Sequence, residues 1–208
     1  LNAKLSSPIP PQWQLAYLPT DTPEGMAYIQ WMNMALEFAR ENRHLMMERV
    51  KEIVFDNLSR YAGIKDVELE LGINAHHNYA ALETHFGQEV WVHRKGAIRA
   101  RQSEYGIIPG AMGSFSYIVK GKGNPESFHS CSHGAGRVMS RKEAIRQFDV
   151  QEVVNDLKSQ NVTLGKRKRS DVAEESRWAY KDIDEVIESQ MDLIEPVLRL
   201  RTVVVVKG

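Results

Sequence analysis

The chain has little of what marks secreted, membrane-spanning or strongly charged proteins. Its 208 residues include one cysteine, so no internal disulfide can form, which suits a reducing compartment. No apolar run approaches the roughly 18 residues that a membrane-spanning helix needs. Its 27 Lys and Arg balance 27 Asp and Glu, so no overall field draws it to nucleic acid or to an anionic membrane. We therefore expect a cytoplasmic protein that has no membrane partner and meets nucleic acid only through local patches.

Length and composition indicate a single domain or a large part of one. Hydrophobic residues make up 42% of the chain and charged residues 26%, the balance of an ordinary packed domain. The sequence begins at Leu1 with neither an initiator methionine nor the apolar core of a signal peptide. Such a beginning is typical of the middle of a longer polypeptide, and we expect residues 1–208 to be a portion of one domain.

The first third of the chain predicts an extended segment followed by helices. Prolines at positions 8, 10, 11 and 19 oppose regular structure and predict an extended segment over residues 1–20. Asp21-Thr22-Pro23-Glu24 combines a capping side chain, an early proline and an acidic first turn, which indicates a helix start. Apolar residues then recur at helical spacing and predict a helical pair over residues 21–60, the second helix from about Arg43 to Leu58. We expect its many methionines to fill the core.

From residue 65 onward the pattern is that of an α+β core. The alternation of apolar and polar residues predicts strands, two of them forming a hairpin about Phe86-Gly87-Gln88. Ser140 and Glu143 have the spacing of a capping box, which predicts that a helix starts right after the loop that carries His133. The predicted strands are 67–71, 79–84, 89–93, 115–120 and 203–206, and the later predicted helices are 150–158 and 183–193. We predict an α+β fold with mixed sheets and flanking helices over residues 65–208.

The segment that points most directly to chemistry is Cys131-Ser132-His133-Gly134-Ala135-Gly136-Arg137, with Arg141 four residues further on. Small neighbours leave the imidazole of His133 unshielded, and Gly-Ala-Gly lets backbone N–H groups approach an anion. Arg137 and Arg141 have the spacing of one helical face, on which two guanidinium groups can grip a phosphate. A histidine in that setting can attack phosphorus and carry it covalently. A lone histidine is more often a core residue, but these neighbours favour a nucleophile.

Two further clusters carry histidine or basic side chains. His76-His77-Asn78 lies where a loop can present imidazole to a metal, and neighbouring residues of an extended backbone face opposite ways, so at most one of the pair would be a ligand. His85 and His93 fall in the predicted hairpin, where we expect them on the surface. Arg94-Lys95-Gly96-Ala97 suits a loop that meets phosphate, although an exposed basic turn is the usual outcome of such a sequence.

Taken together and in order, these segments resemble the RtcB family of RNA-splicing ligases, in its bacterial form. The similarity extends from about residue 15 to the end and corresponds to the C-terminal portion of the family's single catalytic domain. The matching segments are 76–79, 94–97, 105–110, 131–141, 179–184 and 206–208.

The resemblance implies a manganese- and GTP-dependent ligase. Such an enzyme joins an RNA 2′,3′-cyclic phosphate or 3′-phosphate to a 5′-hydroxyl, in tRNA splicing or RNA repair, with tRNA halves or broken RNA as substrates. In that family the histidine matching His133 becomes guanylated by GTP, passes GMP to the RNA 3′-phosphate, and the 5′-hydroxyl then displaces GMP.

The resemblance also assigns roles to other residues. The histidine matching His77 is a manganese ligand. The residues matching Ser116, Tyr180 and Lys207 line the guanine pocket, the backbone of Gly134, Ala135 and Gly136 borders the nucleotide, and Lys95, Arg137 and Arg141 match the basic surface that is expected to meet RNA phosphates or the nucleotide.

The sequence lacks part of what the family uses. The family's first half supplies a cysteine that bridges two manganese ions, an aspartate and two further histidines, and none of their motifs is present in this sequence. The resemblance therefore implies that the chain needs the remaining N-terminal half of the domain as a partner and is inactive without it. Two alternatives stay open: a non-catalytic or regulatory module derived from the same fold, and a metal-dependent nucleotidyltransferase or phosphatase on a related scaffold.

Overall fold

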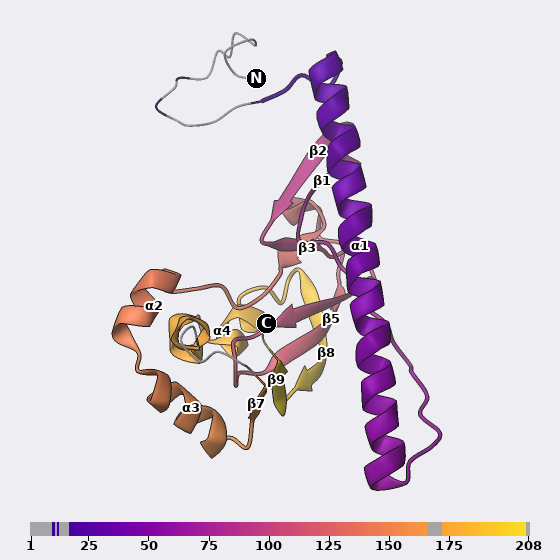
Figure 1. Cartoon of the computed structure of the whole chain (residues 1–208). Helices are drawn as coiled ribbons and strands as arrows, with labels where there is room; N and C mark the ends of the chain where they lie inside the picture. The colour runs from indigo at the N-terminus through magenta and orange to yellow at the C-terminus, as the bar shows by residue number, and fades with distance from the viewer. Residues whose placement is uncertain (1–9, 11, 13–16, 166–171, 207–208) are drawn as a thin grey trace. The chain divides into compact units, whose positions relative to one another are not determined.

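The computed structural model describes residues 10, 12, 17–165 and 172–206 and shows the α+β fold that the sequence predicts (Figure 1). The chain divides into two units, Leu1–Glu70 and Leu71–Gly208. Most of the extended segment expected over residues 1–20 lies outside the described residues, as does Lys207. Within the described part, no helix combines the length and the apolar character that a membrane span requires.

The first unit is built on one long helix, α1 (Pro23–Asn57), where the sequence predicted two. The predicted start is confirmed: the Thr22 hydroxyl accepts a hydrogen bond from the N–H of Gly25 at 3.1 Å, and Pro23 occupies the first turn. Neither glycine nor proline stands between Gly25 and Gly63, so nothing interrupts the helix near residue 40. A π-helical turn, Leu58–Ala62, follows, and Gly63 (φ +69°) ends it in the left-handed conformation.

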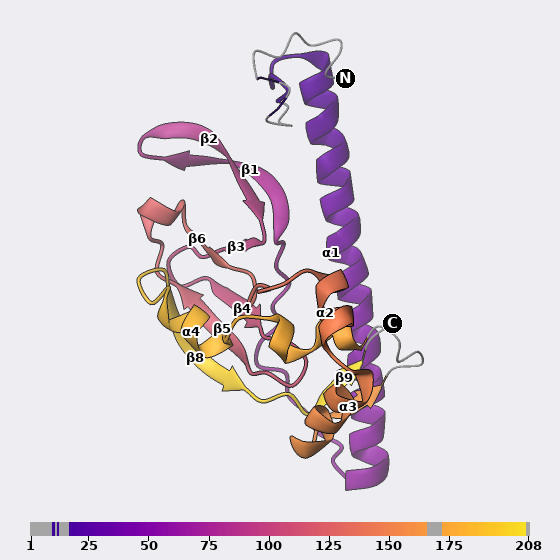
Figure 2. The same cartoon turned by 90° about the vertical axis from the view of Figure 1, so that its left-hand side faces the viewer.

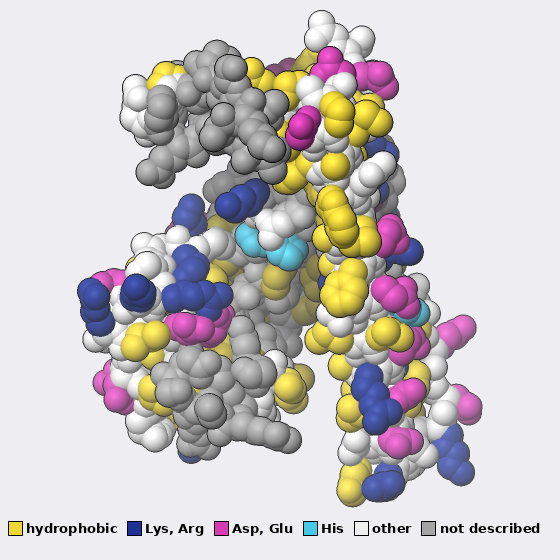
Figure 3. Space-filling model, turned by 45° about the horizontal axis from the view of Figure 1, so that its top comes forward, with side chains coloured by type: hydrophobic (Ala, Val, Ile, Leu, Met, Phe, Trp, Pro, Cys, Tyr) yellow, Lys and Arg dark blue, Asp and Glu magenta, His cyan; other side chains and the backbone are white. Residues whose placement is uncertain are grey.

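Most apolar side chains of α1 are exposed and the others are only half-buried, so the expectation that its methionines fill a core is wrong for the described chain. Gly25 is the one buried residue of the helix. The apolar residues are spread around the helix rather than gathered in one stripe, and Figure 3 shows many of them along its surface. The large exposed apolar residues of α1 are Met26, Tyr28, Trp31, Met34, Phe38, Leu45, Met46, Met47, Val50, Ile53 and Val54.

The strand predicted over residues 67–71 is also wrong. Its side chains alternate as expected, but residues 63–77 form no hydrogen-bonded strand. A strand needs a neighbour to take up its backbone N–H and C=O groups, and no second strand pairs with this segment among the described residues.

The second unit contains the strands, which pair mostly in antiparallel fashion (Figure 2). The predicted hairpin is confirmed as β1 and β2, joined at Phe86 (φ +51°) and Gly87 (φ +76°), two left-handed residues that suit a tight hairpin turn. β3 pairs with β6, and β4, β5 and β8 form a three-stranded sheet, whereas β7 and β9 run parallel. The strands are β1 (Asn78–His85), β2 (Gln88–Lys95), β3 (Ala97–Arg99), β4 (Tyr105–Pro109), β5 (Ser116–Gly121), β6 (Ser130–Ser132), β7 (Thr163–Gly165), β8 (Ile194–Leu200) and β9 (Val204–Val206).

The helices of this unit begin where their caps predict. Ser140 accepts from the N–H of Glu143 at 3.2 Å and starts α2 (Arg141–Gln147), and Asp149 caps α3 (Val150–Ser159). α4 (Ile183–Glu188) is shorter than the predicted 183–193. Pro196, expected just past that helix, lies within β8, an edge strand of its sheet, which is where proline is tolerated. Single 3₁₀ turns span Pro125–Ser127, Ala173–Glu175 and Arg177–Ala179.

Two clusters of buried side chains hold the unit together. One lies between α3, β7 and the Met112 turn. The other joins β3, β4, β5 and α4 through residues such as Ile98, Ile108 and Ile183, and it also includes Cys131 and Ala135. Because these two residues flank His133 at a distance of two positions, the segment that carries the imidazole is anchored in the core on both sides.

A buried ion pair ties the hairpin to the segment before β6. All five guanidinium N–H groups of Arg94 find acceptors: both carboxylate oxygens of Glu83 (2.7 and 3.0 Å), the Tyr79 and Ser130 hydroxyls, and the carbonyl of Phe128. Glu83 also contacts the ring of His85 at 3.0 Å. His85 is 5% exposed, so its predicted place on the surface is wrong, because β1 turns this face toward Phe128 and His129.

We predict that Arg94→Met lowers the free energy of unfolding by about 3–5 kcal/mol, because it leaves the Glu83 carboxylate buried without its partner. Arg101→Met is the matched control: Arg101 is half exposed and lies 3.9 Å from the same carboxylate, so its loss costs less than about 1 kcal/mol. Urea unfolding of both variants measures the difference. Equal losses of unfolding free energy in the two variants would show that the buried pair contributes no more to stability than the exposed one.

The same pair predicts an acid dependence of stability. The Arg94 hydrogen bond lowers the pKa of Glu83 from 4.5 to about 2. A carboxyl with a lowered folded-state pKa stabilises the fold above its unfolded pKa, and this contribution disappears as pH falls through the folded one. Stability should therefore decline between about pH 4.5 and 2, and Glu83→Gln should flatten that decline in unfolding curves recorded across this range.

Candidate active site

His133 lies in the loop after β6, and neighbouring segments hold this loop by its backbone. The N–H of Ala135 donates to the carbonyl of Pro109 at 3.1 Å, at the end of β4. On the other side, the N–H of Lys181 donates to the carbonyl of Gly136 at 2.9 Å. The loop is therefore fixed between two segments that are distant in sequence, and these are the segments that the sequence singled out with it.

The imidazole of His133 is oriented by a backbone carbonyl. Its Nδ1 lies 2.7 Å from the carbonyl oxygen of Gly96. Because a carbonyl only accepts hydrogen bonds, Nδ1 carries the proton of this contact, and in the neutral ring Nε2 then holds the lone pair. The ring of His77 stacks on that of His133, with centroids 5.2 Å apart and planes at 8°. Gly96 joins both residues, since its N–H donates to the His77 carbonyl at 2.9 Å.

Gly96 fits this position because it has no side chain. A Cβ there would stand 3.3 Å from Cε1 and 3.4 Å from Nδ1 of His133, and the backbone is left-handed (φ +72°). The sequence drew attention to the 94–97 cluster for its basic residues. The structure shows instead that Arg94 is buried and that Gly96 is the residue in contact with His133, while Lys95 is exposed at the end of β2.

His133 and the glycine loop open onto a cavity of about 640 Å³. A second cavity of about 490 Å³ lies beside it, with Ser114 and Phe115 in its wall, and Tyr180 lines both. Ser116 follows directly as the first residue of β5, and its hydroxyl accepts from the N–H of Gly110 at 3.4 Å. The first cavity is lined by the predicted residues His133, Gly134, Ala135, Gly136 and Tyr180 together with Gly96, Ser132, Val138, Lys181, Asp182, Glu185, Val186, Ser189 and Gln190.

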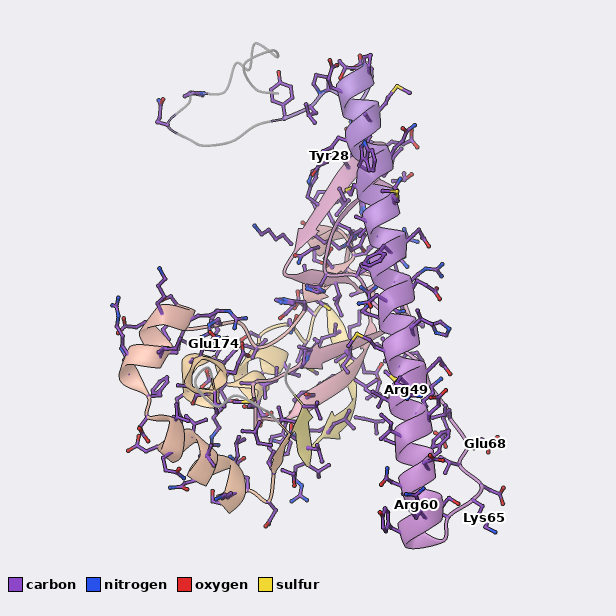
Figure 4. The ribbon with its side chains drawn as sticks, in the orientation of Figure 1. Tyr28, Arg49, Arg60, Lys65, Glu68 and Glu174 are labelled. Carbon is purple, nitrogen blue, oxygen red and sulfur yellow. The ribbon has the colours of Figure 1, made fainter. Side chains whose placement is uncertain are left out.

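The two arginines after the loop do not share a helical face, so that expectation is wrong. Arg137 precedes α2 and bridges to Tyr180, whereas Arg141 is the first residue of the helix. The guanidinium of Arg137 donates to the carbonyls of Met139 and Glu174 and to the Tyr180 hydroxyl, at 2.7–3.0 Å. Arg141 pairs with the carboxylates of Glu174, labelled in Figure 4, and Glu175. Contact of either arginine with phosphate stays a prediction, and a phosphate there would share these guanidinium groups with their present partners.

Tyr180 is held by the same cluster. Its hydroxyl accepts from Arg137 at 2.8 Å and donates to Glu175 at 2.9 Å, and the Arg137 guanidinium lies 4.6 Å from the ring centroid. Burial, followed by the bond to Glu175, raises the pKa of the Tyr180 hydroxyl. Tyr180 therefore stays a neutral phenol, fixed in orientation at the boundary between the two cavities.

The described residues do not amount to a manganese site. Among them there is no group of three or more His, Cys, Asp or Glu side chains placed to hold a metal. A stable site needs more ligands than His76 and His77 provide. Cys131 is no substitute. It is 4% exposed, and burial raises the pKa of its thiol to about 12, so the thiolate that a metal requires is not formed near neutral pH.

The comparisons with known proteins all match one protein family. The family model for tRNA-splicing ligase RtcB matches residues 3–208. The chain is 44% identical to the RNA-splicing ligase RtcB of Escherichia coli K12 and to RtcB1 of another E. coli strain, over 95% of this chain and 48% of either relative. It is 36% identical to the tRNA-splicing ligase RtcB of Pyrobaculum aerophilum, over 95% of this chain and 45% of that protein. The chain thus spans about half the length of these relatives.

We predict that Gly96→Ala displaces the His133 ring, because the new methyl group would press on Cε1 and Nδ1. Gly87→Ala is the matched control: Gly87 has a similar φ of +76° but nothing within 4 Å of its Cβ position. Both variants should lose about 1 kcal/mol of stability to backbone strain. Only Gly96→Ala should shift the ¹H–¹⁵N imidazole signals of His133 in NMR spectra, and matching spectra for the two variants would contradict this.

We also predict that Cys131 resists alkylation in the folded chain, because its thiol is buried and protonated. Iodoacetamide at pH 8 should leave the native mass unchanged over a time in which the urea-unfolded chain reacts fully. Rapid modification of the native chain would mean that the segment before His133 opens readily.

Proposed function

The chain belongs to the RtcB family of RNA-splicing ligases, and on this basis we propose that it carries the guanylation centre of a ligase that joins RNA 3′-phosphate or 2′,3′-cyclic phosphate ends to 5′-hydroxyl ends. The observation that carries the proposal is the hydrogen bond between His133 Nδ1 and the Gly96 carbonyl, in a cavity lined by the glycine loop. It leaves Nε2 as the nucleophilic atom of the ring.

In the proposed first step, Nε2 of His133 attacks the α-phosphorus of GTP. A P–N bond forms, the bond from this phosphorus to the bridging oxygen breaks, and pyrophosphate leaves with the bonding electrons. The Gly96 carbonyl supports this step because it stabilises the positive charge that develops on the ring and keeps the Nδ1 proton in place. The guanylate then passes to the RNA 3′-phosphate, and the 5′-hydroxyl of the second RNA displaces GMP.

The pair of adjoining cavities supports a nucleotide as the ligand. Backbone N–H groups of the glycine loop suit phosphates, because no side chain keeps an anion away from them. The second cavity has aromatic neighbours, Phe115 and Trp178, which suit a base. In this arrangement Tyr180 lies between phosphate and base, and Ser116 and Lys207 are the further residues proposed for the guanine pocket.

Manganese and RNA complete the proposal. We place His77 among the manganese ligands, with the others supplied from outside the described residues, and the metal would polarise the phosphoryl oxygens. Lys95, Arg137 and Arg141 are proposed to meet RNA phosphates. The incomplete metal site of the described chain is the observation that favours the second candidate, a nucleotide-binding module without ligase activity.

We predict a covalent GMP adduct on His133 when the chain, joined to the first half of an E. coli RtcB relative, is incubated with GTP and manganese. Intact-mass analysis detects the adduct directly. His133→Ala should abolish it, because no neighbouring group replaces Nε2, whereas His93→Ala, an exposed histidine of β2, should leave it unchanged. Labelling that persists in His133→Ala would remove this residue from the role, and GTP binding without any adduct would favour the module.

A further inference from the structure

Gln190 stands out among the buried polar side chains. It lies in the turn after α4 and is 6% exposed. Its Oε1 accepts a hydrogen bond from the N–H of Ser132 at 2.9 Å. Its Nε2 is the one buried side-chain nitrogen or oxygen of the described residues without a hydrogen-bond partner. A buried amide donor without an acceptor lowers the stability of the folded chain, and a ligand that supplies an acceptor would remove this penalty.

The orientation of the Gln190 amide follows from its neighbour. Oxygen and nitrogen of a carboxamide look alike, but the Ser132 N–H can only donate, so the atom facing it is the oxygen. Exchanging the two atoms would place two donors against each other. The unpaired atom is therefore the nitrogen, and what it lacks is an acceptor.

The cavity that holds His133 is a place from which an acceptor can reach Gln190. Gln190 lines that cavity together with His133 and the glycine loop, and the residue it holds through Oε1, Ser132, directly precedes His133. For Nε2 to meet an acceptor there, the amide would turn about its bond to Ser132 while Oε1 keeps that bond. The acceptors that a nucleotide offers next to His133 are phosphate oxygens.

We propose that the Nε2 amide of Gln190 donates a hydrogen bond to a phosphate oxygen of the nucleotide bound at His133, which makes Gln190 a ligand-contacting residue of the site. This inference rests on the proposed nucleotide-binding function and adds one donor to it. Gln190 thus does two things with one side chain: its oxygen positions the segment before the nucleophile, and its nitrogen recognises the phosphate.

The test separates these two roles with Gln190→Glu. A glutamate keeps the oxygen that accepts from Ser132 and removes the donor. Calorimetry on the full chain at pH 7 measures binding of GMP and of guanosine, which has no phosphate. Loss of a hydrogen bond to a charged group predicts GMP binding weaker by roughly tenfold to a hundredfold, with guanosine binding unchanged. Ser189→Asp, which adds a carboxylate to the same cavity at the neighbouring residue, controls for charge alone.

A pH series gives a readout that a purely structural role would not move. Once the introduced carboxyl is protonated it can donate again, so the GMP affinity of Gln190→Glu relative to the unsubstituted chain at the same pH should recover as pH falls toward 4.5. An acceptor for Ser132 is present at every pH and predicts no such recovery.

The outcomes are distinct. GMP binding by Gln190→Glu that equals the unsubstituted chain, or a loss that Ser189→Asp reproduces in full, overturns the contact and leaves the proposed function standing. Guanosine binding as tight as GMP binding in the unsubstituted chain overturns it as well, because no phosphate is then recognised. Failure of the unsubstituted chain to bind either compound overturns this inference together with the proposed nucleotide site.

Discussion

The guanidinium of Arg94 is the contact on which the arrangement of the candidate site depends. It lies two residues before Gly96, and it bonds to Phe128 and Ser130, the latter three residues before His133. One buried side chain thus links β2, which ends one residue before Gly96, to β6, which leads to the imidazole. The pairing of β3 with β6 repeats this link through the backbone. The orientation of His133 therefore depends on core packing as well as on the conformation of its loop.

Charge in the site is balanced locally. Arg137 and Arg141 lie with Glu174 and Glu175 in one cluster around Tyr180, where two cations meet two carboxylates. The chain as a whole carries a formal net charge of +0, and positive and negative side chains balance within this cluster as well. An incoming phosphate would compete with carboxylates already in place, so affinity at this cluster depends on how far the ligand can displace them. Backbone and amide donors, such as those of the glycine loop, meet an anion without that competition.

Local signals in the sequence predicted the elements that local interactions stabilise. The caps at Thr22 and Ser140 and the hairpin turn at Gly87 each act within a few residues, and each was predicted correctly. Three-residue strands such as β3 and β6 were missed because their stability comes from a partner about thirty residues away. The alternation of residues 67–71 wrongly predicted a strand, because the alternation is a local pattern whereas a strand also needs a distant partner to pair with.

Of the candidate site, the sequence indicated the histidine, its glycines, Tyr180 and His77, and the structure brings these together. Gly96 was passed over because its basic neighbours drew attention, and only the fold shows that its missing side chain makes room for the imidazole. No pattern pointed to Gln190, since its position beside Ser132 arises from packing between α4 and β6. The burial of His85 likewise depends on Phe128, more than forty residues away.

The stability of helix α1 depends on what covers its apolar side chains. Its ion pairs, such as Arg40–Glu37 and Arg49–Glu52, are exposed and contribute about 0.3–0.5 kcal/mol each. Its apolar side chains, spread around the helix, gain free energy only when another surface removes them from water. The helical population of this segment is therefore linked to whatever surface covers these side chains, whether another part of the chain or a second molecule supplies it.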